Sequence, residues 1–170
     1  MDYNLTLLAL VEIISAVTIG IFILVITFKI MQWVGKKYYD IHDFNLSYSI
    51  FSASVILSVG IMISGIIQPL ISSFRLLLGQ DGNTWLMLKY IGIGGIYIGI
   101  AYSAAVIIGL LSTYIYSKLT PINEFKEIKN NNVGVALIIS SILITLILLS
   151  KDGVILLIES LVPYPDIPPY

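Results

Sequence analysis

Glu12 is the only acidic residue within the long apolar runs that precede Leu149. Ionisable groups are costly in lipid and usually face a polar interior, so such a carboxylate is a candidate for binding a cation or a proton. If the apolar helix begins only at Ile13, Glu12 marks its outer boundary, which is the interpretation we favour. Glu159 has a similar position near the other end of the chain, and the two carboxylates could share a cation if they met at one surface.

The other chemistry-bearing residues form no recognisable catalytic or metal set. His42 is the single histidine and lies beside Asp40 and Asp43, whereas a zinc site takes three or four well-placed ligands. Cysteine is absent, which removes thiol catalysis and thiolate ligands. Because no nucleophile, base and oxyanion set is visible, we expect no enzyme activity, no cofactor and no metal.

The composition places these residues in a membrane protein. Hydrophobic residues make up 58% of the 170 residues and charged residues only 11%, with a mean hydropathy of +0.97, whereas about a quarter of a soluble domain is charged. The net charge of −1 gives no basic field for nucleic acid. Four runs reach the roughly 20 apolar residues that a helix needs to cross a bilayer: 5–34, 46–67, 91–116 and 133–149. We therefore predict an all-α polytopic membrane protein in contact with the lipid bilayer.

Two of these runs continue beyond the length of a crossing. The second extends to Leu78, so we expect a break at Gly65 or Pro69, because proline removes an amide donor. The fourth is interrupted by Lys151, Asp152 and Gly153. Each hairpin is thus predicted to end in a short outer segment along the membrane interface.

A short polar motif occurs twice, 87 residues apart. YYDIHDFNLS at 38–47 and FKEIKNNNVG at 125–134 both separate two apolar runs, and Asn45 matches Asn132. Asp40 likewise matches Glu127, and Ile41 matches Ile128. The chain is therefore predicted to be a tandem duplication of one membrane hairpin, at 1–80 and 81–162, followed by a proline-rich exposed tail at 163–170.

The two connecting segments, called here the first link (35–45) and the second link (118–131), are predicted to begin and end helices. Thr120 and Pro121 favour a helix start. The apolar residues that follow at intervals of three indicate an amphipathic helix along the interface, with Glu124 among the charged residues on its opposite, polar side. Asn45 and Asn132 stand where a new membrane helix begins, where an asparagine caps free amides well. Capping is the interpretation we favour over ligand or partner binding by the asparagine cluster 130–132.

Basic residues fix the expected orientation. Six of the nine lie in or beside the two links: Lys29, Lys36, Lys37, Lys118, Lys126 and Lys129. The positive-inside tendency then places loops 35–45 and 118–131 in the cytoplasm and both termini outside. Hairpins that run in the same direction are related by an axis along the membrane normal.

Gly95, Gly99 and Ser103 are spaced by four along one face of the third apolar run. Small residues at this spacing let helix backbones approach closely in lipid. We expect this face to pack within the four-helix bundle, and packing between protomers of a homo-oligomer is the alternative.

The second link resembles the motif of the YjfL-like family of bacterial inner-membrane proteins, a duplicated domain of unknown function. The residues that carry the resemblance are Thr120, Pro121, Asn123, Glu124, Phe125, Ile128, Lys129, Asn132 and Val133. The first link departs from it, with Lys36-Lys37-Tyr38-Tyr39 in place of the Thr-Pro start. The resemblance implies a location in the bacterial inner membrane and neighbouring genes that encode amidoligases and envelope-stress proteins. It defines no catalytic residues.

Two functions follow from this sequence. In the first, which we favour, the protein is a non-enzymatic oligomeric platform linked to envelope stress, and its cytoplasmic links dock a soluble partner through residues such as Lys126 and Lys129. In the second, several copies form a small pore or ion pathway lined by the serines at 47, 49, 52, 54 and 58. A pore predicts ion flux into liposomes that Glu12→Gln alters, and liposomes that stay tight would exclude it.

Overall fold

The structure is a computed structural model that describes residues 3–38, 40–41, 45–78, 84–119 and 123–161. It contains five helices in this part of the chain: α1 (Tyr3–Tyr38), α2 (Leu46–Leu78), α3 (Thr84–Leu119), α4 (Glu124–Lys129) and α5 (Val133–Leu161). Four are long and apolar enough to cross a membrane, with candidate spans Ala16–Lys37, Leu46–Ile67, Gly94–Ser112 and Val133–Ser160. The predicted all-α fold with four such helices is confirmed, and the tail at 163–170 lies outside the described residues.

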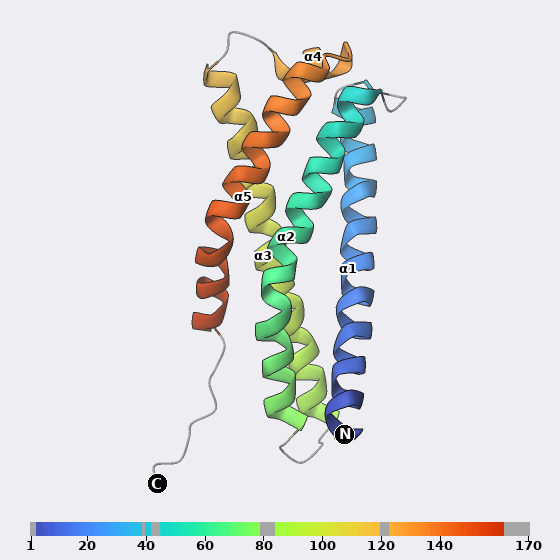
Figure 1. Cartoon of the computed structure of the whole chain (residues 1–170), viewed down its shortest axis with the longest axis vertical. Helices are drawn as coiled ribbons and strands as arrows, with labels where there is room; N and C mark the ends of the chain where they lie inside the picture. The colour runs from blue at the N-terminus through green and yellow to red at the C-terminus, as the bar shows by residue number, and fades with distance from the viewer. Residues whose placement is uncertain (1–2, 39, 42–44, 79–83, 120–122, 162–170) are drawn as a thin grey trace.

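The long helices alternate in direction, so both links lie at the same end of the bundle (Figure 1). α1 and α3 run toward this end, α2 and α5 run away from it, and α4 lies across it. α2 is the central helix, because it packs against α1, α3 and α5. Its most extensive partner is α5, so the two helices that leave the links form the heart of the bundle.

The helix bounds repeat with a regular offset. α1 and α3 each have 36 residues, and α3 begins and ends 81 positions after α1, at Thr84 against Tyr3 and at Leu119 against Tyr38. α5 begins 87 positions after α2, at Val133 against Leu46. The stretch between α3 and α5 (120–132) is therefore six residues longer than the stretch between α1 and α2 (39–45), and six is the length of α4.

The expected breaks in the second and fourth runs do not occur. α2 is helical through Gly65 and Pro69, and α5 is helical through the segment 151–153, so the short outer interfacial segments predicted there are wrong. Tertiary packing readily keeps glycine and proline inside membrane helices. Gly65 itself lies at the α2–α5 contact, where an added Cβ would collide with Ile155 Cδ1 and meet Lys151 Cε at 2.9 Å.

Two apolar clusters form the interior. The larger joins all four long helices through residues such as Ile23, Met62, Tyr97 and Leu143. The second, called here the link-end cluster, lies beneath the links and consists of Met31, Ile41, Tyr48, Phe51, Ile128, Val135, Ala136 and Ile139. Ile41 and Ile128, one from each link, are 6% and 0% exposed, so both links contribute a buried side chain to one core.

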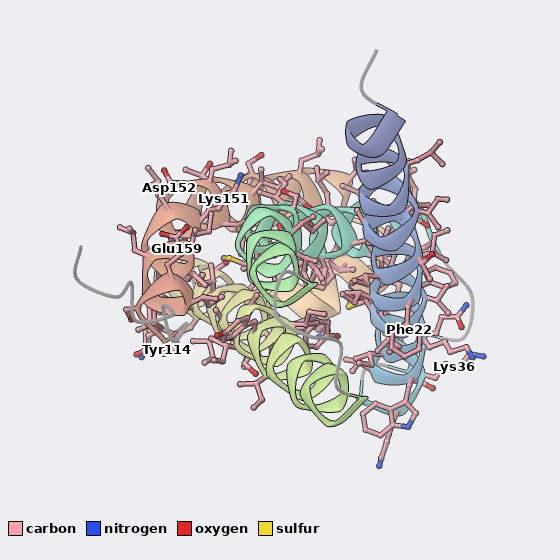
Figure 2. All side chains as sticks on the ribbon, turned by 90° about the horizontal axis from the view of Figure 1, so that it is seen from below. Phe22, Lys36, Tyr114, Lys151, Asp152 and Glu159 are labelled. Atoms are coloured by element: carbon pink, nitrogen blue, oxygen red, sulfur yellow. The ribbon has the colours of Figure 1, made fainter. Side chains whose placement is uncertain are left out.

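The outer surface of the bundle suits lipid. Large apolar side chains are exposed along the helices, including Phe22 at 66% and Leu149 at 77%. In the view along the bundle, Lys36 lies at the periphery of α1, whereas Lys151, Asp152 and Glu159 lie together on α5 on the other side (Figure 2). Non-polar side chains that would cost free energy in water are stable in contact with hydrocarbon.

Gly35 brings α1 close to α2. A Cβ at this position would lie 2.6 Å from the Tyr48 hydroxyl oxygen, and Tyr48 is 1% exposed and donates a hydrogen bond to Met31 O. Because this side chain is fixed, we predict that Gly35→Ala lowers the free energy of unfolding by about 1–3 kcal/mol, measured by denaturation in detergent. Gly20→Ala is the matched control, because nothing lies within 4 Å of its added Cβ. Equal stability of the two variants would contradict this close packing.

Candidate functional site

The two links are joined by the side chain of Asn45. Its Nδ2 donates hydrogen bonds to Ile128 O at 2.9 Å and to Lys129 O at 3.0 Å, which are carbonyls at the end of α4. Its Oδ1 accepts from Tyr48 N at 2.7 Å. Asn45 therefore caps the start of α2, as predicted, and also donates to two of the last carbonyls of α4, a helix end that needs partners from outside the helix.

Asn131 makes the reciprocal contact from the second link. Its Oδ1 accepts from Ser47 N at 3.0 Å and from Ser47 Oγ at 3.2 Å, so a second amide at the start of α2 is satisfied by a residue 84 positions away. Asn131 has a φ of 62°, in the left-handed region that asparagine tolerates better than most residues. The first link thus supplies hydrogen bonds to the end of α4, and the second link supplies one to the start of α2.

Asn132 begins α5 as predicted. Its Oδ1 accepts from Val135 N at 3.4 Å and its Nδ2 donates to Glu127 Oε2 at 2.8 Å. The backbone just before it closes α4, with Asn131 N donating to Ile128 O and Asn132 N donating to Glu127 O. This pair of bonds around a left-handed residue is a Schellman C-cap, which lets α4 and α5 meet with one residue between their caps.

The first link differs from the second in its backbone. Asp40 and Ile41 are not helical, and Asp40 has a φ of 52°. Glu127, which matches Asp40 in the sequence repeat, lies inside α4. Asp40 instead accepts an ion pair from Lys129 Nζ at 2.8 Å across the two links, and this exposed pair contributes little stability.

α4 begins at Glu124. Asn123 is its N-cap and accepts from Lys126 N at 3.1 Å; Thr120 and Pro121 lie outside the described residues. Phe125 packs edge to face against Phe51, with ring centroids 6.0 Å apart. This contact fixes α4 on α2, while Lys126 is exposed on its outer side.

Glu124 is the unexpected member of the site. It is 6% exposed, and its Oε1 has no hydrogen-bond partner. Among the residues whose side-chain burial the structure describes, no other acidic or basic residue is buried. The sequence pattern placed Glu124 on the polar side of α4, so its burial corrects that expectation.

The other candidates lie away from the links. Gly95, Gly99 and Ser103 are exposed on α3, and an added Cβ at either glycine meets nothing within 4 Å, so the expectation that this face packs inside the bundle is wrong. Glu12 is part of α1, four residues before the candidate span Ala16–Lys37; its side chain lies outside the described residues.

Sequence reasoning missed the contact between Ser47 and Asn131 and the close approach at Gly35. The only signal for the first was the recurrence of asparagine near both helix starts, which predicts caps within each link. Nothing in a single sequence indicates that an asparagine of the second link accepts hydrogen bonds from the start of α2. Gly35 could have been noticed as the only glycine near the end of the first run.

Comparison with known proteins gives a match to a family model in the second half of the chain. Residues 91–155 match the family model described as Domain of Unknown Function (DUF350), and this range contains all of α4 and its caps. Neither curated proteins nor solved structures give a significant match. The chain is thus a multi-pass membrane protein with four candidate spans and a match to DUF350 at 91–155.

Because the Asn45 side chain makes three hydrogen bonds, we expect its removal to lower the stability of the protein substantially. Asn45→Ala loses one cap and two donors to carbonyls, so we expect the free energy of unfolding to fall by about 2–3 kcal/mol. Asn45→Ser retains a capping oxygen and is expected to lose less.

The matched control is Asn130→Ala, in the same asparagine cluster but exposed, for which we expect a change below about 0.5 kcal/mol. The measurement is denaturation of the purified protein in detergent. If Asn45→Ala were no more destabilising than Asn130→Ala, the hydrogen bonds between the links would not hold the structure.

Proposed function

We propose that the protein is a non-enzymatic, oligomeric platform of the bacterial inner membrane whose link end faces the cytoplasm and docks a soluble partner. The resemblance of the second link to the YjfL-like family supports a role in envelope stress. The repeated helix bounds support an origin by duplication of one hairpin. Lysines concentrated at the link end support the cytoplasmic orientation.

The proposal rests mainly on one observation: most polar side chains at the second link bond within the protein, whereas Lys126 does not. Asn123, Glu127, Asn131 and Asn132 all bond within the protein, and Lys129 pairs with Asp40. Lys126 is exposed and makes no ion pair with any described residue. A rigid frame that presents a free cation is suited to bind an acidic surface.

Other exposed lysines extend this cationic surface. Lys37 stacks over the ring of Trp33, with Nζ 4.6 Å from the centroid, and Lys118 lies over Tyr114 at 5.7 Å. Each pair lies at the link end of α1 or α3, at corresponding positions of the two hairpins. These aromatic partners hold the lysines near the membrane surface.

The pore hypothesis loses support from the positions of the serines. Ser47, Ser52, Ser54 and Ser58 are 0–5% exposed inside a single protomer, so they do not line a passage between protomers. Ser54 donates to Phe51 O in its own helix. The serine run therefore favours close helix packing.

Docking through Lys126 predicts a charge-dependent interaction. We expect Lys126→Glu to reduce recovery of the soluble partner on membranes about tenfold or more, as fits the loss of an interfacial charge contact. Cross-linking and mass spectrometry in native membranes measure this recovery.

Lys126→Arg keeps the charge and should retain the partner. Asp152→Lys places a charge change at the far end of α5, where Asp152 is exposed, and should also retain it. Unchanged recovery with Lys126→Glu would reject the docking surface.

Oligomerisation is proposed to use the open face of α3 that carries Gly95, Gly99 and Ser103. Gly99→Leu is expected to convert oligomers to monomers in mild detergent, because the bulky side chain separates the helices, without loss of protomer stability. Gly109→Leu is the contrasting variant: its added Cβ lies 3.6 Å from Leu143 Cδ1, so it should destabilise the protomer. An unchanged mass of the Gly99→Leu particle by light scattering would exclude this face.

A further inference from the structure

Three lysines and a tryptophan lie on one face of α1 near the link end: Lys29, Trp33, Lys36 and Lys37. At 3.6 residues per turn, these positions fall within about a third of the helix circumference. All four side chains are exposed, and Lys37 Nζ lies 4.6 Å from the centroid of the Trp33 ring. α1 lies at one edge of the bundle and packs mainly against α2 (Figure 2). This group, called here the lysine face, therefore meets the surroundings of the protein.

Lys29 lies within the membrane-spanning part of α1. The candidate span is Ala16–Lys37, and Lys29 precedes its end by eight residues, about 12 Å along the helix axis. Within the described part of the chain, Lys29 makes no hydrogen bond or ion pair. A charged group at this depth is costly in hydrocarbon, so the position calls for an anion that reaches it.

The equivalent face of α3 lacks two of these cations. At the offset of 81 positions between the two helices, α3 carries Leu110 in place of Lys29 and Ser117 in place of Lys36. Only the outermost lysine has a counterpart, Lys118. Leu110 is 67% exposed, so α3 presents an apolar side chain at the depth of Lys29. A general need to anchor membrane helices therefore does not account for the lysine face.

We propose that the lysine face binds the headgroup of an anionic phospholipid from the leaflet at the link end. A lysine ammonium carries three donors, and its bonds to phosphate oxygens are charge-assisted and therefore strong. Long lysine side chains reach from the hydrocarbon toward the headgroups. Lys29 thus approaches the phosphate from the membrane side, and Lys36 and Lys37 approach it from the link side.

A lipid fits this face better than a soluble anion does. Toward the middle of the span the same face continues with Phe22 and Ile26, whose exposed side chains suit acyl chains. The cations lie near the end of the span, which is the level of the headgroups. Basic residues beside a membrane helix recognise anionic headgroups by charge. An anionic phospholipid supplies both the negative charge and the apolar chains that the face matches.

Trp33 can report directly on the lipids beside it. The chain has two tryptophans, so Trp85→Phe leaves Trp33 as the single indole, and bromine atoms on an acyl chain quench the fluorescence of an adjacent indole. The full chain is placed in vesicles of phosphatidylcholine with a minority of phosphatidylglycerol, and bromine is carried by one lipid or the other. We expect phosphatidylglycerol to be enriched near Trp33 about fivefold over its share of the vesicle, as fits one well-placed lysine at an anionic surface.

Variants assign the enrichment to the lysine face. Lys29→Gln should remove most of it, whereas Lys29→Arg keeps the charge and should retain it. Lys151→Gln is the matched control, because Lys151 lies on α5 away from the links, and should leave it unchanged. A second reporter, with Trp33→Phe, Trp85→Phe and Tyr114→Trp, monitors the equivalent face of α3, where we expect little enrichment.

Equal quenching by the two brominated lipids at Trp33 would overturn the proposal, as would an enrichment that survives in Lys29→Gln. Equal enrichment at the α3 reporter would show a general attraction of the bundle for anionic lipid and would also refute it. Loss of the enrichment on addition of inorganic phosphate at constant ionic strength would identify a site for the free ion instead. None of these outcomes depends on docking through Lys126 or on oligomerisation through α3, which are measured separately.

Discussion

Asn45 donates a hydrogen bond to Ile128 O, 83 residues away, and Asn131 accepts one from Ser47 N, 84 residues away. These bonds satisfy the first amides of α2 and the last carbonyls of α4, groups that a helix leaves without intrahelical partners at its ends. Both hairpins are therefore fixed at one end by the same few atoms. The contact of α2 with α5, which is the most extensive in the bundle, follows directly from this junction.

The junction explains why the interior is divided into two clusters. Beneath the links, Ile41 and Ile128 are buried among residues of α1, α2 and α5. Further along, apolar packing joins the four long helices, and Gly65 allows α2 to approach Ile155. In lipid there is little hydrophobic driving force between helices, so close approach and polar contacts decide their arrangement. The polar contacts among the described residues are concentrated at the link end, which makes this end the most defined part of the surface.

Single-sequence reasoning predicted the features that depend on local chemistry. The number of helices follows from the length of the apolar runs, and the capping roles of Asn45 and Asn132 follow from their residue type at a helix start.

Features that depend on packing were not predictable in this way. Pro69 and Gly65 suggested a break because local propensity disfavours helix there, yet α2 continues through both, and Gly65 lies where α2 approaches Ile155 of α5. Gly95 and Gly99 suggested an internal contact because the spacing fits, yet spacing does not say which face of α3 meets a neighbour. Glu124 looked solvent-exposed from its charge, and only the position of α4 on α2 reveals its burial.

The central claim is that the two links lie against each other within one protomer. The chain has no cysteine, so the pair Ser47→Cys and Asn131→Cys can be introduced without background and oxidised in native membranes. We expect rapid formation of an intramolecular disulfide, seen as a mobility shift of the monomer, and none for Ser47→Cys combined with Asp152→Cys. Absence of the shift in the first pair, or a bond formed only between chains, would contradict it.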